Sequence, residues 1–597
     1  MVVPVPGAGC IAGGWRVYTY LSGTSCQLDC VYGATGVVVT EIARREFLRL
    51  GLAAAMAPVL MGTRAGRTRA RDSAPRGGAT LTNRDLEAST IAVEEATIAG
   101  LQGRMTSGSI TAEELVSAYL SRIDALDRNG PRINAVLELN PDALAIARAR
   151  DHERARGHVR GPLHGIPILL KDNIDTADGM MTTAGSLALV GPAPSQDATV
   201  AARLRKAGAV ILGKTNLSEW ANMRSTHATS GWSGRGGQTR NPYVLTRNPG
   251  GSSSGSAAAV SANLCAAALG TETDGSIVLP ANNCGVVGIK PTVGLTSRAG
   301  VIPISHSQDT VGCHGRTVAD AAAVLGALVG VDARDGATSA SAGKFHTNYT
   351  QFLDPHGLDG ARIGVARHRM TGFSSAADEV LAHAIQSMRD AGATVVDPAD
   401  IPTIDKIMSS FAEDLVEVYE FKRGLNAYLA TRHGVPIHSL ADAIAFDEAH
   451  RQREMRWFGQ EWFELAQADS YSKTEYESAL ARIRRRGGRN GIDAALEQHN
   501  LHALIAPTGP LPWVTSLRNG DPSSGRTAAP AALAGYPLIS VPAGHRQGLP
   551  LGISFMGTAW SEPRLIRLAS GFEAVTRARR KPFFLSSLAG DGAGAPV

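Results

Sequence analysis

The sequence predicts an α/β protein in which strands and helices alternate around a layered core. Short apolar runs bounded by glycine or charged residues, such as residues 165–170 and 209–213, are typical of interior strands. Segments with helical spacing alternate with these runs, as residues 200–208 do. A strand–helix–strand unit then begins again over residues 361–396. This alternation favours a sheet covered by helices over an all-helical or all-strand protein.

The composition is ordinary for a soluble globular chain. Of the 597 residues, 44% are hydrophobic and 19% are charged, and the net charge of +5 gives no indication of a nucleic-acid partner. With 66 glycines and only 5% aromatic residues, the chain suits a large aliphatic core threaded by turns. After the leader no stretch reaches transmembrane length, so we expect no stable membrane association of the mature protein.

Residues 40–71 resemble a twin-arginine signal peptide. Arg44-Arg45 precede an apolar run from Leu50 to Met61 that is too short to span a bilayer and has the length of a signal core. We therefore expect export by the twin-arginine route to the periplasm, the cell envelope or the medium, with residues 72–84 as a linker. The alternative is a chance arginine pair before an apolar helix.

Residues 1–39 lie upstream of this signal, whose charged beginning should be short. We predict that they are a non-native extension and that translation starts near Val37, Val38 or Val39. The cysteines that follow the signal, Cys265, Cys284 and Cys313, indicate neither a disulfide framework nor a metal site. Cys265 lies in an Ala-rich run and should be buried.

Residues 85–585 are predicted to form the catalytic domain. A helix should begin at Thr111, because Thr111 and Glu114 have the spacing of a capping box. Residues 405–500 are charged and helical with no clear strand, and should cover the core. The elements expected beyond them are strands at 503–508, 538–542 and 552–555, a helix at 562–579, and a disordered tail at 586–597.

Two serine-bearing stretches carry the chemical information. Residues 250–256 (GGSSSGS) offer amides and hydroxyls ahead of a helix expected from Ser256 to about Leu269. Residues 270–277 (GTETDGSI) place successive backbone amides before Ser276, which suits an oxyanion hole. A serine amidase needs such donors together with a nucleophile and a proton carrier. Each stretch taken singly is also compatible with an ordinary turn with capping serines.

Two rival catalytic patterns are weaker. Residues 251–255 fit the G-x-S-x-G elbow with Ser253 as nucleophile, but Asn248 and Pro249 argue against the strand that must precede it. That pattern also needs an acid and then a histidine downstream, and the residues around His502 and His545 match no catalytic motif. Sixteen scattered histidines without an H-E-x-x-H or C-x-x-C pattern indicate no metal, and we expect no cofactor. The histidines nearest the serine stretches should be turn or polar-core residues: His164, His227, His306 and His314.

The motifs resemble those of the amidase signature family, and within it those of the peptide amidases most closely. The resemblance runs from about residue 90 to 580. It is carried by H-G-I-P (164–167), K-D-N (171–173), G-K-T-N (213–216), the two serine stretches, G-V-V-G-I-K-P-T (285–292), S-Q-D-T (307–310), A-P-T (506–508), A-G-Y-P (534–537) and W-S-E-P (560–563).

This resemblance implies the amidase signature fold, a single large mixed β-sheet covered by α-helices on both faces. It also implies a Ser-cisSer-Lys triad, in which Ser276 is the acylated nucleophile, Ser252 follows a cis peptide bond, and Lys171 is the base. A base must be uncharged, so burial should lower the pKa of Lys171, and Asp172 should point elsewhere. The oxyanion would be held by amides in the stretch Thr273, Asp274, Gly275 and Ser276.

The implied reaction is hydrolysis of carboxamides, with C-terminal amides of peptides preferred, to carboxylate and ammonia. The stretch 274–278 (DGSIV) replaces the G-G-S-I-R of many family members, which matches the peptide amidases and disfavours the tRNA-linked amidotransferase component. Two alternatives remain: a broad acyl- or aryl-amide hydrolase, and a non-catalytic binding protein on the same scaffold. The sequence indicates a small-molecule or peptide amide as partner and no particular oligomeric state.

Overall fold

The chain separates into two compact units, residues 1–80 and 81–597. The computed structural model describes residues 14–21, 24–33, 36–37, 93–522 and 527–589. In the first unit, β1 (Gly14–Leu21), β2 (Thr24–Gly33) and β3 (Gly36–Val37) form an antiparallel sheet. The predicted signal peptide and linker lie outside the described residues, as do residues 590–597 of the predicted tail. These assignments, and that of residues 1–39 as an extension, stay predictions.

The second unit is built on one mixed sheet of eleven strands, in the order β13-β12-β14-β16-β15-β10-β11-β9-β5-β6-β4. Parallel pairs join β13, β12 and β14 at one end and β9, β5 and β6 at the other, and antiparallel pairs make up the rest. This confirms the predicted α/β fold. The strands are β4 (Val136–Leu139), β5 (Pro167–Lys171), β6 (Val210–Thr215), β9 (Ala267–Glu272), β10 (Val287–Lys290), β11 (Thr310–Gly315), β12 (Arg362–Val365), β13 (Thr394–Val396), β14 (Ala503–Pro507), β15 (Leu538–Arg546) and β16 (Leu549–Met556).

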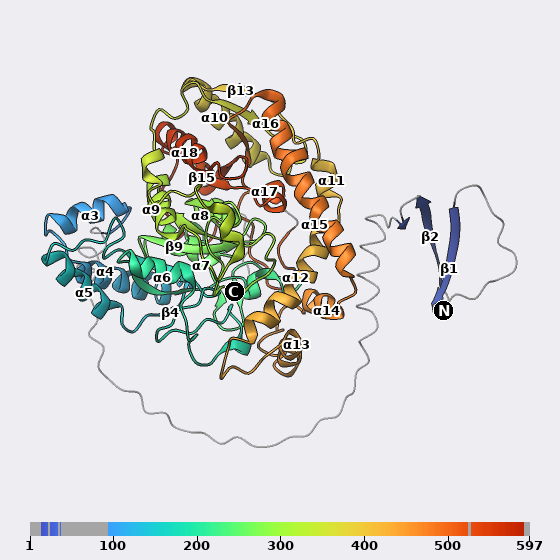
Figure 1. Ribbon diagram of the computed structural model, residues 1–597, viewed down its shortest axis with the longest axis horizontal. Coiled ribbons are helices and arrows are strands. Elements are labelled where there is room, and N and C mark those ends of the chain that lie inside the picture. Colours follow the sequence, from blue (N-terminus) through green and yellow to red (C-terminus); the bar gives the residue numbers. More distant parts are fainter. Residues whose placement is uncertain (1–13, 22–23, 34–35, 38–92, 523–526, 590–597) are drawn as a thin grey trace, which may run out of the picture. The chain divides into compact units, whose positions relative to one another are not determined.

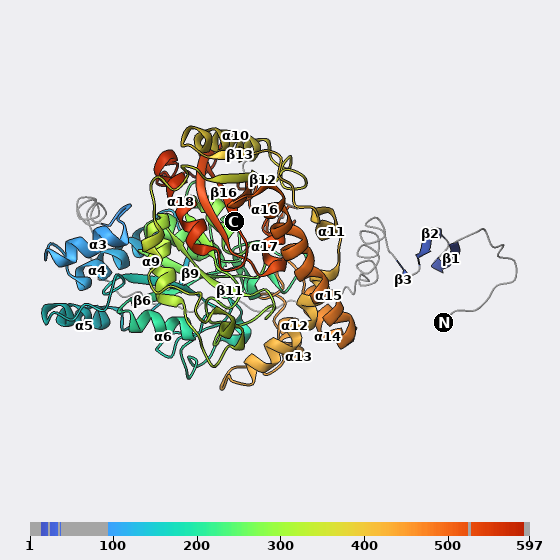
Figure 2. The same cartoon turned by 45° about the horizontal axis from the view of Figure 1, so that its top comes forward.

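Helices cover both faces of this sheet (Figures 1 and 2). Ile539 and Phe555 point to one face of the sheet and belong to the large core cluster, whereas Leu538 and Met556 point to the other and belong to a second cluster. This follows from the alternation of side chains along a strand. The first face carries α9 (Val318–Leu328), α10 (Ser375–Asp390) and α18 (Glu562–Thr576), and the second α7 (Ser254–Ser261), α8 (Val278–Cys284) and α17 (Ala529–Ala534).

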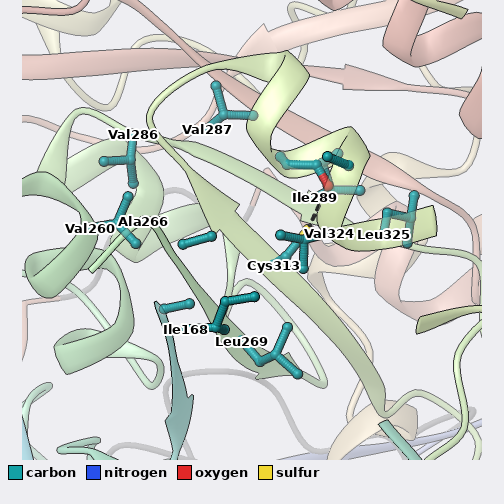
Figure 3. Packing of buried hydrophobic residues seen from close by; sticks show 14 of the residues in the cluster. Ile168, Val260, Ala266, Leu269, Val286, Val287, Ile289, Cys313, Val324 and Leu325 are labelled. Atoms are coloured by element: carbon teal, nitrogen blue, oxygen red, sulfur yellow. Dashed lines mark hydrogen bonds between the residues drawn. The ribbon is translucent and has the colours of Figure 1, made fainter. Parts of the chain in front are cut away.

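The large core is aliphatic, as the composition predicts. Figure 3 shows Val324 and Leu325 of α9 beside Ile289 of β10 and Cys313 of β11. Cys265 is fully buried with a free thiol, which confirms the prediction for that residue.

The amino-terminal elements of the second unit lie around the β4 end of the sheet. The capping box is confirmed, since Thr111 Oγ1 accepts from the Glu114 amide and the Glu114 carboxylate accepts from the Thr111 amide. The helices are α3 (Ile98–Thr106), α4 (Ala112–Arg122), the π-helical η1 (Ile123–Arg128), α5 (Ala143–Ala155) and α6 (Thr199–Lys206). A short hairpin, β7 (Trp232–Ser233) and β8 (Gly237–Gln238), follows β6.

Residues 404–499, which we call the helical cover, contain no strand, as predicted. Phe421 and Phe463 stack within it at 5.4 Å, and Trp220 packs edge-on against Phe463 at 5.6 Å. Its elements are α11 (Ile404–Met408), α12 (Ala412–Leu429), α13 (Leu440–Ala449), α14 (Glu461–Ala468), α15 (Lys473–Gly487), the π-helical η6 (Gly488–Asp493) and α16 (Ala494–His499). Within the described part of the chain no helix is long and apolar enough to cross a bilayer.

The helix predicted from Ser256 to about Leu269 is wrong in its second half. α7 ends at Ser261, Asn263 has a φ of 59°, and residues 267–272 form β9. Arg122 donates to the carbonyls of Ala262 and Asn263 and so satisfies the end of α7. Pairing with β5 and β11 then stabilises an extended chain in this Ala-rich run, so tertiary contacts override its helix propensity.

Candidate active site

The site lies where β5 and β9 end. These two strands are parallel neighbours, so their carboxyl ends meet at one edge of the sheet. Lys171 is the last residue of β5, and Glu272 is the last residue of β9. The chain after Glu272 turns through residues 273–276 into α8. The loop at residues 250–253 comes from a third segment, and the Ser253 amide donates to the Ser276 carbonyl at 3.1 Å.

Lys171 is fully buried and is held by three acceptors. Its Nζ donates to Ser252 Oγ at 2.8 Å, to Thr271 Oγ1 at 2.9 Å and to the Thr271 carbonyl at 3.2 Å. Burial lowers the pKa of Lys171 to about 7, and the carboxylates of Asp309 and Glu272 only partly oppose this effect. This shift is in the direction that a base requires, and it makes the uncharged amine accessible near neutral pH.

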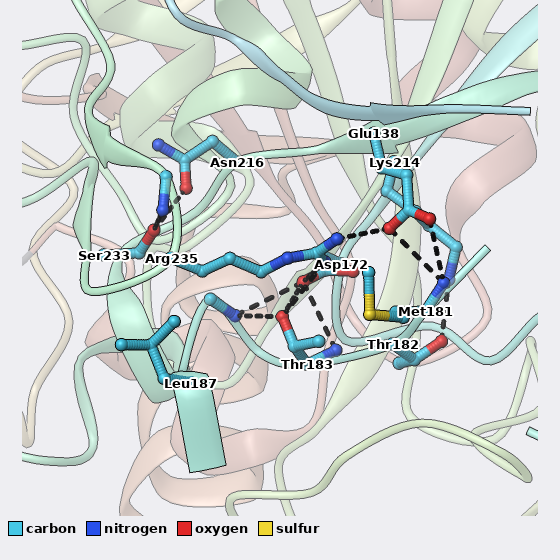
Figure 4. A network of polar contacts seen from close by, with 12 residues as sticks. Glu138, Asp172, Met181, Thr182, Thr183, Leu187, Lys214, Asn216, Ser233 and Arg235 are labelled. Atoms are coloured by element: carbon cyan, nitrogen blue, oxygen red, sulfur yellow. Dashed lines mark hydrogen bonds and ion pairs between the residues drawn. The ribbon is translucent and has the colours of Figure 1, made fainter. Parts of the chain in front are cut away.

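Asp172 points away from Lys171, as expected. Its carboxylate accepts from the Thr183 hydroxyl and from the amides of Thr183 and Gly185, and the Arg235 guanidinium lies 3.5 Å from it. Figure 4 shows this group of polar side chains, in which Arg235 extends between Asp172 and Glu138. These contacts of the Asp172 carboxylate all involve Oδ2, and Asp172 is not among the carboxylates that act on the pKa of Lys171.

The serine loop is fixed by its backbone. The Gly251–Ser252 peptide bond is cis, as the resemblance implied. The Ser252 carbonyl accepts from the Ser218 amide at 3.0 Å. A Cβ at Gly251 would lie 2.3 Å from Ser218 Oγ and 2.7 Å from Ser230 Oγ, so only glycine fits at this position.

Ser276 lies at the end of a turn that opens towards the surface. Gly275 has a φ of 80°, which favours glycine, and Ser276 keeps 9% of its surface exposed. Among the described residues, no acceptor binds the amides of Gly275 or Ser276, and Ser276 Oγ makes no hydrogen bond. The structure thus joins Lys171 to Ser252 directly, whereas Ser276 is held beside the serine loop by the bond from the Ser253 amide to its carbonyl, without a bond between the Ser252 and Ser276 hydroxyls.

Three further residues of the site were not singled out from the sequence. Thr271 supplies two of the acceptors of Lys171, and its hydroxyl also accepts from Asn173 at 3.0 Å. The Glu272 carboxylate accepts from the amides of Ile277 and Val278, which fixes the start of α8 directly after Ser276. Both residues lie inside the 270–277 stretch, so their position in the motif was the available signal.

Asp309 is the third such residue, and it lies in the S-Q-D-T motif. It accepts from Thr273 Oγ1 at 2.6 Å and from the amides of Ile304 and Ser305. Its loop is in turn bound to the helical cover through Glu420 of α12. The Glu420 carboxylate accepts from Ser305 Oγ, Ser307 N, Ser307 Oγ and Tyr476 OH.

The elbow alternative does not fit the geometry. No strand directly precedes Ser253, since β8 ends at Gln238, and the Ser253 hydroxyl is bound to the Thr271 carbonyl at 3.1 Å and amide at 3.2 Å. His164 and His314 are buried polar-core residues whose rings contact backbone carbonyls. In the described ranges no cluster of three or more His, Cys, Asp or Glu side chains is arranged to hold a metal ion.

Comparison with known proteins identifies the family of the chain. The family profile described as Amidase matches residues 114–566. The chain belongs to the amidase family. A probable amidase of Arabidopsis thaliana is 44% identical over 506 residues, covering 83% of this chain and 93% of the relative. The native peptide amidase of Stenotrophomonas maltophilia is 53% identical, with a TM-score of 0.78, over 82% of this chain and 99% of the solved one.

A third relative has a different named activity. It is a component of the glutamyl-tRNA(Gln) amidotransferase of Chloroflexus aurantiacus, 38% identical over 490 residues, and the match covers 80% of this chain and 96% of the relative. All these relatives are named for amide chemistry, and this amidase is accordingly an amide-hydrolysing enzyme with the amidase signature fold. The predicted family, its likeness to peptide amidases and the predicted enzyme class are confirmed.

Proposed function

We propose that this amidase hydrolyses carboxamides, preferably the C-terminal amides of peptides, through an acyl-enzyme formed on Ser276. The observation that carries the proposal is the 2.8 Å contact between the buried amine of Lys171 and Ser252 Oγ, together with the lowered pKa of that amine. The likeness to a peptide amidase supports the substrate class.

In the proposed reaction, Ser276 Oγ attacks the amide carbonyl while its proton passes to Ser252 and the Ser252 proton passes to Lys171. The tetrahedral oxyanion binds to backbone amides in the Thr273–Ser276 turn, of which those of Gly275 and Ser276 have no acceptor within the described residues. Lys171 then returns its proton through Ser252 to the leaving nitrogen, and ammonia departs. Water, deprotonated by the same relay, cleaves the ester and restores Ser276.

The relay needs a hydrogen bond between Ser252 and Ser276 that is formed when substrate is bound. When Lys171 is uncharged, its nitrogen can accept the Ser252 hydrogen across the 2.8 Å contact, and Ser252 Oγ can then accept the hydrogen of Ser276 Oγ. The partial exposure of Ser276 allows substrate to approach its Oγ.

Ammonia release from peptide amides, fatty amides and aryl amides tests the substrate class. We expect kcat/KM to be highest for peptide amides. Similar values for all three would favour the broad hydrolase, and no release from any would favour a binding protein. Acid quenching during turnover, followed by digestion and mass spectrometry, should find the acyl group on Ser276. An acyl group on Ser252 or Ser253 would refute the assigned nucleophile.

We further propose export by the twin-arginine route, which the Arg44-Arg45 pair and the apolar run after it support. Replacing both arginines by lysine should retain the enzyme in the cytoplasm, as measured by fractionation. Amino-terminal sequencing of the precursor would identify its start, and a precursor beginning at Met1 would contradict the predicted extension.

A further inference from the structure

Four cationic side chains line one cavity on the outer side of the helical cover. The cavity measures about 290 Å³ and is lined by Thr403, Lys406, Arg482, Arg485, Arg486 and Asn490. Lys406 comes from α11 and the three arginines from α15, two helices that lie side by side in Figures 1 and 2. The lining holds no carboxylate.

These charges are not balanced by the protein. Among the residues that the structure describes, none of the four cations forms an ion pair with a carboxylate. The Nε of Arg482 is buried and makes no hydrogen bond. Burial lowers the pKa of Arg486, and the charges of Arg482 and Arg485 lower it further. Arg486 is therefore held next to two like charges that no carboxylate offsets, and the arrangement needs a cause other than ion pairing.

The helix dipole does not provide that cause. Basic residues stabilise the last turn of a helix that ends in solvent, but α15 passes without a gap into η6 and α16. The backbone beneath the arginines is instead tightly fixed. Thr403 Oγ1 donates to the Arg486 carbonyl at 2.6 Å, and Arg486 Nη1 donates to the Lys406 carbonyl at 3.2 Å. A Cβ at Gly491 would lie 2.1 Å from the Arg486 carbonyl oxygen, so glycine is required where η6 packs against the last turn of α15.

We propose that this cavity is a binding site for a phosphate group, free or carried by a small molecule. Planar guanidinium groups bind phosphate oxygens in pairs, and the three arginines that line this open cavity match a compact oxyanion with two negative charges. Thr403 and Asn490 add neutral polar groups at the rim. An anion bound there would neutralise the repulsion between Arg482, Arg485 and Arg486.

The cationic cavity is separate from the catalytic site around Lys171, Ser252 and Ser276, but packed helices link the two. Ala479 and Ile483, on the inner side of α15, pack against Ala529 and Leu533 of α17. A Cβ at Gly275 would lie 3.8 Å from the Cβ of Ala528, directly before α17. Phosphate binding is nevertheless inferred from the cavity itself and does not depend on the proposed reaction.

The test is calorimetric titration of the full-length enzyme with inorganic phosphate and, separately, with phenyl phosphate, at constant ionic strength set with chloride. We expect one phosphate per chain and a rise in melting temperature that grows with phosphate concentration. Arg485→Gln should weaken binding about tenfold, because it removes one charge-assisted pair. Arg485 is exposed, so this variant should fold.

Arg484→Gln is the matched control. It removes the same charge from the position directly before Arg485 on α15, and Arg484 does not line the cavity. It should change affinity by less than about twofold. Equal weakening in both variants would show diffuse attraction and overturn the proposal, as would failure of the wild type to bind either probe. Binding of inorganic phosphate alone would identify the free ion, and tighter binding of phenyl phosphate would identify a phosphorylated molecule.

Discussion

Lys171 and Lys214 are both buried on neighbouring parallel strands, but their surroundings differ. Lys171 donates to two hydroxyls and one carbonyl beside the serine loop. Lys214, opposite Leu170 in the register, donates to Thr182 Oγ1 and the Ile174 carbonyl, both at 2.7 Å. Burial lowers the pKa of both lysines. At Lys214 this is opposed by four carboxylates, those of Asp172, Asp175, Asp178 and Glu138.

The difference shows that burial does not by itself make a lysine a base. Lys214 lies among carboxylates that are stabilised by its positive charge, so its ammonium has a structural role. The partners of Lys171 also suit a neutral amine, and only the carboxylates of Asp309 and Glu272 oppose the lowering of its pKa. Asp172 separates the two cases, because it follows Lys171 in the chain and yet its charge acts on Lys214.

The largest expected effect tests Lys171 as the base. Lys171→Met should lower kcat at neutral pH by about 10²–10⁴-fold, the usual contribution of general base catalysis. The fold should be retained, since a neutral side chain replaces an amine that burial already disfavours in its charged form. Amide hydrolysis and thermal unfolding measure the two outcomes. A folded variant with normal activity would remove Lys171 from the mechanism.

Lys214→Met should have the opposite signature. Removing this cation leaves the surrounding carboxylates with only their arginine partners, Arg205, Arg235 and Arg432, and this loss of a buried charge should cost about 3 kcal/mol in the free energy of unfolding. The fraction that folds should keep its turnover. Urea unfolding with active-site titration separates stability from activity. An unchanged unfolding midpoint would show that the carboxylates near Lys214 do not depend on its charge.

The pH profile distinguishes the same two lysines. Because the base must be unprotonated, kcat/KM should rise about tenfold per pH unit below about pH 7 and level off above it. Lys214→Arg keeps the charge and should leave this profile in place. A profile whose midpoint lies near that of an ordinary lysine, about 10.4, would contradict an uncharged Lys171 at neutral pH.

Asp172→Asn should affect stability more than catalysis. It removes one of the carboxylates around Lys214 and the more distant of the two carboxylate partners of Arg235, while the amide oxygen still accepts from the Thr183 and Gly185 amides. We expect a loss of about 1–3 kcal/mol in unfolding free energy and a small change in kcat. A shift of the pH midpoint by more than about one unit would show that Asp172 acts on Lys171 after all.

The smallest effect is expected for Ser253→Ala. The Ser253 hydroxyl contacts only the Thr271 backbone, and a hydrogen bond of this kind contributes about 0.5–1.5 kcal/mol to stability. Activity should fall less than about tenfold. Complete loss of turnover with retention of the fold would revive the elbow interpretation.

The α/β fold class was predictable from local sequence, whereas the Lys171–Ser252 contact was implied by the resemblance to the amidase signature family. Apolar runs indicated β5 and β6, and Thr111 and Glu114 fixed the start of α4. β9 was missed because alanines at 266–268 favour a helix, and only pairing with β5 and β11 makes them a strand.

The partners of Asp172 and Thr273 were equally inaccessible to sequence reasoning. Arg235 lies 63 positions after Asp172, and Asp309 lies 36 positions after Thr273, so no local spacing connects either pair. The acceptors of Lys171 at Thr271 depend in the same way on the pairing of β5 with β9. Long-range pairing of this kind determines how the predicted residues are held.

The contacts of Glu420 couple the opening of the helical cover to that of the Asp309 loop. Lifting α12 from this loop would strip the Glu420 carboxylate of its three donors from Ser305 and Ser307 and, in the same event, loosen the loop that orients Asp309. The helical cover and the loop at residues 304–309 beside the catalytic site should therefore open cooperatively rather than one after the other. Amide hydrogen exchange at Ile304 and Ser305 should then proceed at the rate of α12, as in a single foldon.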